Sequence, residues 1–340
     1  MMQKQKLRIA VTGLSAGACH VADYAACSSV EELILCDVSE KKLEEVGEQY
    51  HIEKRYTDYT AMLNEEKPDA VSLAVPNYLH MPLAVQALEH GCHVLCEKPM
   101  ARTAAEAGIM KDAASRSGKI LMINFNQRFQ PDCRALKKVI DNGLLGDIYY
   151  IRTLWHRQRG VPWWYPLAKG RETCGGGALI DLGVHVLDRA LWFCGYPGAV
   201  QVMGAGFSHI AQKEAPAHGL EHFDLEDMGV AMIRLDSGAM LELEASWAAN
   251  RENEEITTRI YGTRGGALLK DDRTVLFLEK DGGVEKVDLE PEEGPNIRQV
   301  FLDTILGRTA PVCTPEEGME VSAILDAVYR SAETGFAVLL

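Results

Sequence analysis

The sequence lacks the marks of several classes of protein. No stretch of its 340 residues approaches the ~20 apolar residues that a membrane-spanning helix requires. The opening MMQKQKLRIAVTG passes from a short basic lead into a strand, without the apolar core and cleavage site of a signal peptide. Basic residues are scarce, with 35 Lys and Arg against 49 Asp and Glu and a formal net charge of −14. This balance argues against nucleic acids and anionic membrane surfaces as partners.

The cysteines lack a regular spacing. Nine are scattered along the chain, an odd number, and no C-x-x-C pair occurs. This pattern argues against a disulfide framework and a zinc site and favours a reducing compartment. We therefore expect a cytoplasmic protein that holds no metal. His218 and His222 lie four residues apart in a polar segment, but no third ligand is evident, so we interpret them as solvated loop residues.

The length of the chain exceeds one typical core, so two domains are expected. Hydrophobic residues make up 47% of the sequence and charged residues 25%, which is ordinary for a globular protein. In residues 1–125, short apolar runs alternate with amphipathic segments, which predicts a parallel sheet with crossover helices. The strands are expected at 7–12, 32–36, 70–75, 93–96 and 120–124, and the helices at 40–50, 82–90 and 104–117.

Residues 126–340 follow a different pattern, in which strands dominate and few helices intervene. The segment MLELEASW, residues 240–247, alternates apolar and polar side chains, as half-exposed antiparallel strands do. An α+β domain with a largely antiparallel sheet is therefore expected, with a polar surface loop at 208–224. Helices are predicted at 131–142, 297–306 and 315–333, and strands at 148–155, 200–207, 229–235, 240–247, 256–261, 267–269 and 275–279.

The first strand ends in GLSAGA, residues 13–18, which approximates the pattern G-x-G-x-x-G/A. Gly13 permits a tight turn, and Ser15, Ala16 and Gly17 follow where the backbone would approach a pyrophosphate at a helix N-terminus. Ser15 replaces the usual glycine, and its hydroxyl either crowds a phosphate or bonds to it. Many strand–turn–helix joints contain such glycines, so this fingerprint by itself is weak.

Asp37 strengthens the case for a dinucleotide. It ends the second strand, 24 residues after Gly13, close to the ~20 expected for the acid that holds a ribose. Neither Val38 nor Ser39 offers a cation to a 2′-phosphate, which favours NAD over NADP. The alternative is that Asp37 caps the next helix, a role that Ser39 fills equally well.

The most informative segment is GGGALIDLGVHVL, residues 175–187. Three glycines precede apolar residues at helical spacing, and Asp181, His185 and Asp188 stand at i, i+4 and i+7, which predicts a polar stripe on one face. An apolar helix with an inward carboxylate and imidazole must pair them or line a wet cavity with them. Two interpretations stay open, a positioned acid/base pair and a buried structural hydrogen bond.

Several motifs occur in a specific order along the chain. PNYLH (76–80), CEKP (96–99), NFNQRF with Arg128, GGGALIDLGVH, YGTRGG (261–266) and the closing PEEGMEVSAILDAVYRSAETG follow the glycine turn. This ordered set resembles the Gfo/Idh/MocA oxidoreductases, and the resemblance runs essentially end to end. It implies an α/β Rossmann domain, a doubly wound parallel sheet, at 1–125. It also implies an α+β substrate and oligomerisation domain with a large, mostly antiparallel open sheet at 126–340.

The resemblance further implies a nicotinamide cofactor and hydride transfer at a carbinol carbon. Lys98, Asp181 and His185 match the family's catalytic trio, and the Lys98–Pro99 peptide is expected to be cis. In these roles Lys98 favours developing alkoxide charge, His185 is the general base, and Asp181 orients it or holds a second hydroxyl. The positions assigned to the cofactor beside the glycine turn and Asp37 are Pro76, Asn77, His80, Glu97, Lys98 and Arg128.

Other interpretations of these residues remain open. Asn77 and His80 could cap the helix that begins near Pro82, and Arg128 could form a salt bridge across the domain boundary. His156 follows a sheet strand and is a candidate for substrate contact. Trp164, in an aromatic run, is either a stacking platform for substrate or a subunit contact.

The expected function is NAD-dependent hydride transfer between nicotinamide and a secondary hydroxyl or ketone of a sugar, polyol or related compound. Two alternatives are an NAD-dependent redox-lytic glycosidase, which uses the same trio, and a non-catalytic cofactor-binding regulator. An open sheet with one uncovered face invites packing against another copy, so a homodimer or homotetramer is expected.

Overall fold

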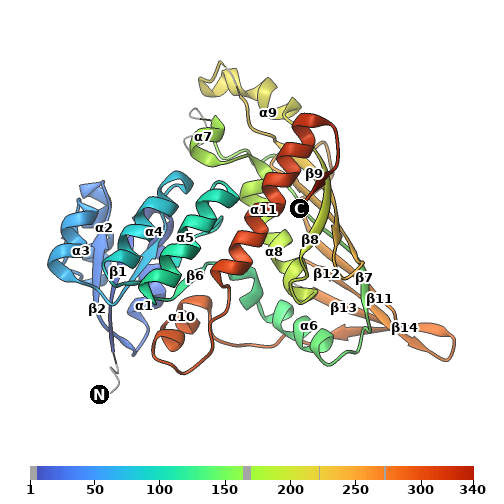
Figure 1. Ribbon diagram of the computed structural model, residues 1–340, viewed down its shortest axis with the longest axis horizontal. Coiled ribbons are helices and arrows are strands. Elements are labelled where there is room, and N and C mark those ends of the chain that lie inside the picture. The colour runs from blue at the N-terminus through green and yellow to red at the C-terminus, as the bar shows by residue number, and fades with distance from the viewer. Residues whose placement is uncertain (1–5, 164–169, 222, 272) are drawn as a thin grey trace. The chain divides into compact units, whose positions relative to one another are not determined.

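The computed structural model describes residues 6–163, 170–221, 223–271 and 273–340, which form two compact units (Figure 1). The first unit runs to Asn124 and takes in Pro295–Met319, and the second contains Phe125–Gly294 and Glu320–Leu340. The sequence predicted a first domain at 1–125, and residues 295–319 pack with that unit as well. The cause is burial of Phe301 and Leu302, on a helix that packs against the first unit's sheet and its first helix.

The first unit is a six-stranded parallel sheet in the order β3-β2-β1-β4-β5-β6. Its inner strands are almost wholly buried because helices cover both faces, as the apolar runs predict. The strand order reverses between β1 and β4, where parallel sheets bind ligands at the carboxyl ends. Its elements are β1 (Leu7–Thr12), α1 (Leu14–Ala25), β2 (Val30–Cys36), α2 (Glu40–Tyr50), β3 (Arg55–Tyr56), α3 (Tyr59–Glu66), β4 (Ala70–Leu73), α4 (His80–Glu89), β5 (His93–Cys96), α5 (Ala104–Ser117), β6 (Leu121–Ile123) and α10 (Ile297–Ile305).

The second unit is a nine-stranded sheet in the order β14-β13-β12-β11-β7-β10-β9-β8-β15. Its strands pair antiparallel except β7 with β10, which are parallel. Its elements are α6 (Pro131–Asp141), β7 (Ile148–His156), α7 (Gly170–Cys174), α8 (Val184–Phe193), β8 (Ala199–Phe207), α9 (His209–Glu214), β9 (Met228–Leu235), β10 (Met240–Ser246), β11 (Glu255–Gly262), β12 (Gly265–Lys270), β13 (Arg273–Lys280), β14 (Gly283–Leu289) and β15 (Val338–Leu339), and α11 (Pro315–Thr334) begins in the first unit and ends in the second.

The two faces of this sheet differ in polarity. On β10, Leu241 and Leu243 are fully buried on the face that packs against α8, here called the inner face. Glu242 and Glu244 alternate with them on the opposite, outer face, as MLELEASW predicts.

Some segments depart from the expected pattern. The predicted loop at 208–224 contains α9 and a 3-10 turn over Ala215–His218. The Asp227 carboxylate accepts hydrogen bonds from the backbone N–H groups of Ile210 (2.8 Å) and Ala211 (2.7 Å), which satisfies donors at the start of α9. Because the Asp227 carboxylate lies outside residues 208–224, the sequence of that segment does not by itself predict α9. No helix in the described residues is long and apolar enough to cross a membrane.

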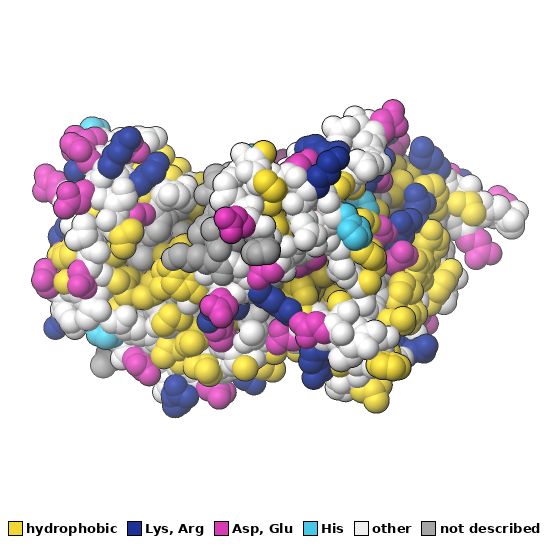
Figure 2. All heavy atoms as spheres, turned by 90° about the horizontal axis from the view of Figure 1, so that it is seen from above, with side chains coloured by type: hydrophobic (Ala, Val, Ile, Leu, Met, Phe, Trp, Pro, Cys, Tyr) yellow, Lys and Arg dark blue, Asp and Glu magenta, His cyan; other side chains and the backbone are white. Residues whose placement is uncertain are grey.

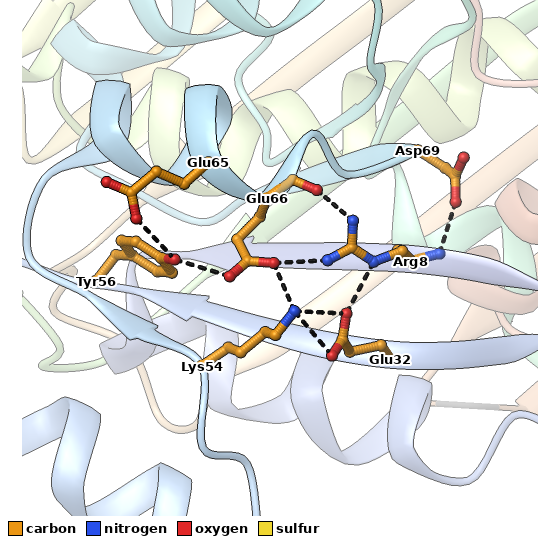
Figure 3. A network of polar contacts seen from close by, with 7 residues as sticks. All are labelled: Arg8, Glu32, Lys54, Tyr56, Glu65, Glu66 and Asp69. Carbon is orange, nitrogen blue, oxygen red and sulfur yellow. Dashed lines mark hydrogen bonds and ion pairs between the residues drawn. The ribbon is translucent and has the colours of Figure 1, made fainter.

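A charged network ties β1 to its neighbours at the end of the strand away from the glycine turn (Figure 3). Arg8 on β1 pairs with Glu32 of β2 (2.8 Å) and with Glu66 of α3 (2.6 Å). Lys54 and Tyr56 bond to the same Glu66 carboxylate at 2.6 and 2.7 Å. Because these side chains are partly exposed, each pair contributes little stability, and the network chiefly fixes the positions of β1, β2 and α3.

Candidate active site

The β1–α1 turn is shaped for a close backbone approach. Gly13 has φ +86°, and a Cβ built there would lie 2.3 Å from the carbonyl oxygen of Ala74 at the end of β4. Gly17 is also tightly packed, with the nearest side-chain atom 3.1 Å from such a Cβ. Ser15 and Ala16 are exposed in the first turn of α1. The turn therefore lies at the switch point between β1 and β4 and fits the pyrophosphate of a dinucleotide.

Asp37 stands beside this turn at the end of β2. Its two carboxylate oxygens accept hydrogen bonds from the backbone N–H groups of Leu14 (2.6 Å) and Ser39 (2.8 Å). Ser39, not Asp37, caps α2, since its Oγ accepts from the backbone N–H of Lys42. Each carboxylate oxygen can accept a second hydrogen bond, so Asp37 fits the hydroxyls of a ribose. Val38, 91% exposed, offers no cation to a 2′-phosphate.

Glu97 and Lys98 follow β5, and the Lys98–Pro99 peptide is cis, as the resemblance implied. The Glu97 carboxylate accepts hydrogen bonds from His20 Nε2 (2.9 Å), from Asn124 Nδ2 and from the backbone N–H of Lys98 (3.2 Å). Burial opposes ionisation of Glu97, but the hydrogen bond and charge of His20 outweigh it and lower the pKa of Glu97 to about 2. Glu97 is thus a partly buried anchor for the backbone at Lys98.

Sequence reasoning did not single out His20. This residue is fully buried on α1, and its Nδ1 lies 2.8 Å from Ser72 Oγ of β4. It stands three residues after Gly17, so a histidine on the helix that follows a glycine turn was the available signal. His20 links the nucleotide turn to the loop that carries Lys98.

The PNYLH motif is folded differently from either interpretation of its histidine. His80 is fully buried, and its ring nitrogens lie 2.7 Å from the Pro99 carbonyl oxygen and 2.9 Å from that of Val75. Its ring therefore holds two loops together and is not available to a cofactor. Pro76 and Asn77 precede α4 in a short 3-10 turn, Asn77–Leu79, and Leu79 occupies the N-cap position without a side-chain bond among the described residues.

In the second unit, the glycine-rich segment leads into a π-helical turn, Leu179–Gly183, which continues as α8. A Cβ on Gly177 would lie 2.0 Å from the carbonyl oxygen of Glu226, so only glycine fits there. The buried Glu226 carboxylate accepts hydrogen bonds from the backbone N–H groups of Gly177 and Leu179 and from the Tyr329 hydroxyl, each at 2.9 Å. Burial raises the pKa of Glu226 despite these donors. Glu226 therefore fixes the start of the helical segment that carries Asp181.

Asp181 and His185 are held by two tryptophans of neighbouring strands. Trp247 Nε1, just beyond β10, donates a hydrogen bond to Asp181 Oδ2 at 2.8 Å. The His185 ring lies against Trp155 of β7, with 5.6 Å between ring centroids. Asp181 and His185 are partly exposed, while their helical neighbours are buried. The second unit thus presents a carboxylate and an imidazole as an oriented pair.

Asp188 does not belong to this pair, which corrects the predicted three-residue stripe. Its side chain is 1% exposed and bonds to Arg128 and to the Tyr196 hydroxyl. The π turn at Asp181 is wider than an α-helical turn, so the i+7 position does not continue the face of Asp181.

Arg128 is held in a buried cluster of the second unit. Its guanidinium donates to both oxygens of Asp188, from Nε at 3.0 Å and Nη2 at 2.6 Å, and to Tyr196 at 2.9 Å. The group also lies over the rings of Tyr196 and Phe125, at 4.9 and 5.3 Å from their centroids. All of these residues belong to the second unit.

His156 faces away from the pair formed by Asp181 and His185. Successive side chains of a strand point to opposite faces, and Trp155 occupies the inner face beside His185. His156 therefore lies on the outer face, where its Nε2 is 3.4 Å from Glu244 Oε2 and burial lowers its pKa. Trp155 is thus the strand residue at the site. Trp164, the other predicted substrate contact, lies outside the described residues.

Comparisons with known proteins bring these observations together. Residues 7–125 match the model of the oxidoreductase family with an NAD-binding Rossmann fold, and residues 133–268 match the GFO/IDH/MocA C-terminal domain. The chain is 32% identical to the D-glucoside 3-dehydrogenase of Escherichia coli K12, over all of this chain and 99% of the relative. The chain belongs to the Gfo/Idh/MocA oxidoreductase family. It is therefore an oxidoreductase, and its first unit is an NAD-binding Rossmann domain.

Other members of the family support the same assignment. The levoglucosan dehydrogenase of Pseudarthrobacter phenanthrenivorans is 28% identical over 71% of this chain and 65% of its own length. A levoglucosan dehydrogenase solved in complex with NADH shares the fold, with a TM-score of 0.86 over 98% of this chain and 99% of that chain at 24% identity. An aldose-aldose oxidoreductase from Caulobacter crescentus superimposes with a TM-score of 0.83 at 27% identity, over 98% of this chain and 100% of that chain.

Proposed function

We propose that this Gfo/Idh/MocA dehydrogenase uses NAD to oxidise a secondary hydroxyl of a neutral sugar, glucoside or polyol to the ketone. The observation that carries the proposal is the Asp181–His185 pair, which Trp247 and Trp155 hold on a π turn. The end-to-end similarity to a D-glucoside 3-dehydrogenase supports the substrate class.

The proposed roles follow from the chemistry of each side chain. Bound NAD supplies the acceptor for the hydride that leaves the carbinol carbon. His185 accepts the hydroxyl proton at a ring nitrogen, and Lys98 donates a hydrogen bond to the oxygen as negative charge develops on it. Asp181 accepts a hydrogen bond from a second hydroxyl of the substrate, its own carboxylate being oriented by Trp247.

The residues proposed to hold the cofactor come from the ends of the parallel strands. The β1–α1 turn, with Gly13, Ser15, Ala16 and Gly17, would bind the pyrophosphate through backbone N–H groups. Asp37 would accept hydrogen bonds from the adenosine ribose, and its charge would repel the 2′-phosphate of NADP. Pro76, Asn77, Glu97 and Lys98 occupy the loops after β4 and β5 and would contact or orient the nicotinamide end.

The test is a cofactor titration followed by a substrate screen. Calorimetry should show binding of NAD and weaker binding of NADP, and a screen of sugars, glucosides and polyols should then yield NADH. Lys98→Met and His185→Asn should abolish turnover and leave NAD affinity largely intact. Lys41→Met and His209→Asn, at exposed positions on α2 and α9, are the matched controls and should retain full rate.

Each alternative function has its own outcome in this screen. Aglycone release without accumulation of NADH would establish the redox-lytic glycosidase. NAD binding without hydride exchange with any alcohol or ketone would establish a regulator. Full turnover by both Lys98→Met and His185→Asn would refute the proposed roles.

We further propose that the outer face of the large sheet mediates a homodimer or homotetramer in the cytoplasm. Met203 on β8 and Met232 on β9 pair in register there, 59% and 40% exposed. Phe207 on β8 and Tyr261 on β11 add exposed apolar area on the same face, and hydrophobic side chains are visible at the molecular surface (Figure 2). A cytoplasmic location fits nine cysteines that are all free. Light scattering should show that Met203→Glu shifts the protein to monomers.

A further inference from the structure

A cavity of about 300 Å³ lies on the inner face of the large sheet. The described residues of its walls belong to the second unit and come from α6 and the segment before it, from α8, and from β11, β12 and the residues beside them. The lining residues used below are Gln127, Asp132, Arg189, Glu254, Ile256, Leu269 and Asp271. The volume is at the lower end of the range for small-molecule pockets.

This cavity adjoins the Asp181–His185 pair. Ile256 is the direct partner of Trp155 across the β7–β11 ladder, so their side chains are neighbours on the inner face. Glu254 Oε1 accepts a hydrogen bond from Trp155 Nε1 at 2.9 Å. Arg189 stands one helical turn beyond His185 on α8. The indole of Trp155 therefore neighbours the His185 ring and two residues of the cavity wall, Glu254 and Ile256.

Some polar groups that line the cavity lack hydrogen-bond partners among the described residues. Arg189 is 3% exposed, and within the described residues it makes one hydrogen bond, from Nη2 to Thr258 Oγ1 at 2.7 Å, and no ion pair. In the same part of the chain, its Nε and the Oε1 of Gln127, which is 6% exposed, are buried and have no hydrogen-bond partner. Native structures pair such groups, so an arginine and an amide left in this state indicate a ligand with donors and acceptors of its own.

The charge of the cavity limits what that ligand is. Among the lining residues, Asp132, Glu254 and Asp271 place three carboxylates beside the guanidinium of Arg189, and Glu254 also pairs with Arg157 at 3.4 Å. Such a wall disfavours phosphorylated or carboxylated groups. Carboxylates, an amide and a guanidinium, with Ile256 and Leu269 as an apolar wall, suit a ring that carries several hydroxyls.

We propose that this cavity is a second sugar subsite, which takes a neutral polyhydroxylated group attached to the ring that Asp181 and His185 act on. The proposal rests on the proposed function and narrows it to glycosides or disaccharides. Trp155 provides the shared platform, on which the apolar face of a sugar stacks between the two positions.

Binding to the NADH-saturated protein tests the subsite, because an alcohol is not turned over when the cofactor is already reduced. The probes are methyl β-D-glucoside, cellobiose, maltose, trehalose and D-glucose 6-phosphate, titrated by calorimetry. At least one disaccharide should bind about tenfold more tightly than the methyl glucoside, the factor that one hydrogen bond to a charged group supplies. Glucose 6-phosphate should show no such gain.

Two variants test whether residues of the cavity cause the higher affinity for the disaccharide. Asp271→Gly removes one carboxylate at an exposed position with φ +46°, which glycine adopts without strain. Arg189→Met removes the guanidinium, and Asp271→Gly still decides the matter if the buried change prevents folding. Asp281→Gly, at φ +51° in the β13–β14 turn and outside the cavity, is the matched control. The disaccharide advantage should fall severalfold or vanish in the first two variants and persist in the control.

Equal affinity for disaccharide and monosaccharide in the wild type, or an unchanged ratio in both cavity variants, would overturn the subsite. The substrate screen separates this failure from failure of the proposed function. NADH formed from sugars with no disaccharide preference refutes the subsite alone. A disaccharide preference in binding without any NADH formation refutes the dehydrogenase assignment and leaves the subsite standing as a binding site.

Discussion

Replacement of Arg128 by methionine should destabilise the second unit and leave NAD affinity unchanged. The side chains of Arg128 and Asp188 are 4% and 1% exposed, and two hydrogen bonds join them. Methionine fills most of the space of the arginine stem but leaves the Asp188 carboxylate buried without its cation. Tyr196 would still donate to that carboxylate, which is insufficient to balance a full charge.

The expected cost follows from the burial of both partners. Removal of one member of a buried ion pair costs about 3–5 kcal/mol, because the remaining charge is desolvated and uncompensated. For a domain of roughly 150–250 residues, each kcal/mol lowers Tm by about 2–4 °C, so the fall in Tm should be roughly 6–20 °C. Arg152→Met is the control. Its guanidinium is 47% exposed and pairs with Glu244 on the outer face, so its loss should cost no more than about 1 kcal/mol.

Urea denaturation followed by tryptophan fluorescence measures the loss, and calorimetric titration with NAD measures the affinity. The double variant Arg128→Met/Asp188→Leu should recover most of the stability, because it removes both charges together. A weaker NAD affinity at unchanged stability would refute the assignment and return Arg128 to the cofactor site. A double variant no more stable than Arg128→Met would show that the pair itself is not the source of the loss.

Three further predictions concern the nucleotide turn, the Glu97 anchor and the Asp181 pair. Gly13→Ala should abolish NAD binding in calorimetry, because its Cβ would meet the Ala74 carbonyl oxygen at 2.3 Å and φ +86° is strained for alanine; unaltered affinity would contradict this. The pKa of Glu97 is about 2 in the folded protein and roughly 4.3 in the unfolded chain. Ionised Glu97 should therefore add about 3 kcal/mol to the free energy of unfolding above pH ~4.3, and this stabilisation is lost as the pH falls towards 2. The pKa of His20 is raised, so protonated His20 stabilises the fold below pH ~6.5, and this stabilisation is lost as the pH rises through the pKa of His20 in the folded protein. The urea midpoint, measured across pH, should show both changes in the wild type and neither in His20→Asn. Trp247→Phe keeps the apolar packing but removes the donor to Asp181, so kcat/KM should fall about tenfold or more while NAD affinity holds, and an unchanged rate would show that Asp181 needs no orientation.

Local patterns predicted the fold class and the cofactor. Apolar runs such as residues 70–73 form strands covered on both faces, and the alternation in 240–246 forms a strand with one exposed face. Gly13 and Asp37 stand at the ends of β1 and β2, where the chain order requires parallel strands to end together. These features depend on residues near one another in sequence, so periodicity and spacing contain the information.

The predictions were wrong where the position of a side chain depends on strand register, on local helix geometry or on a partner far away in the sequence. His156 and Trp155 are adjacent, and only the pairing of β7 with its neighbours decides which of them faces α8. The π turn adds width at Asp181, which removes Asp188 from the predicted stripe. Arg128 and Asp188 lie 60 residues apart, and nothing near either position indicates the other.

The sequence by itself determined which chemical groups the chain carries and in what order, and so the parallel and antiparallel sheets, the glycine turn and the family. The tertiary structure alone decided which of those groups meet. His20 reaches Glu97, Trp247 reaches Asp181, and Arg189 is buried beside a cavity one turn from His185. The physical reason is that spacing along a chain constrains only neighbouring dihedral angles, whereas burial and hydrogen bonding are settled by packing between segments far apart in sequence.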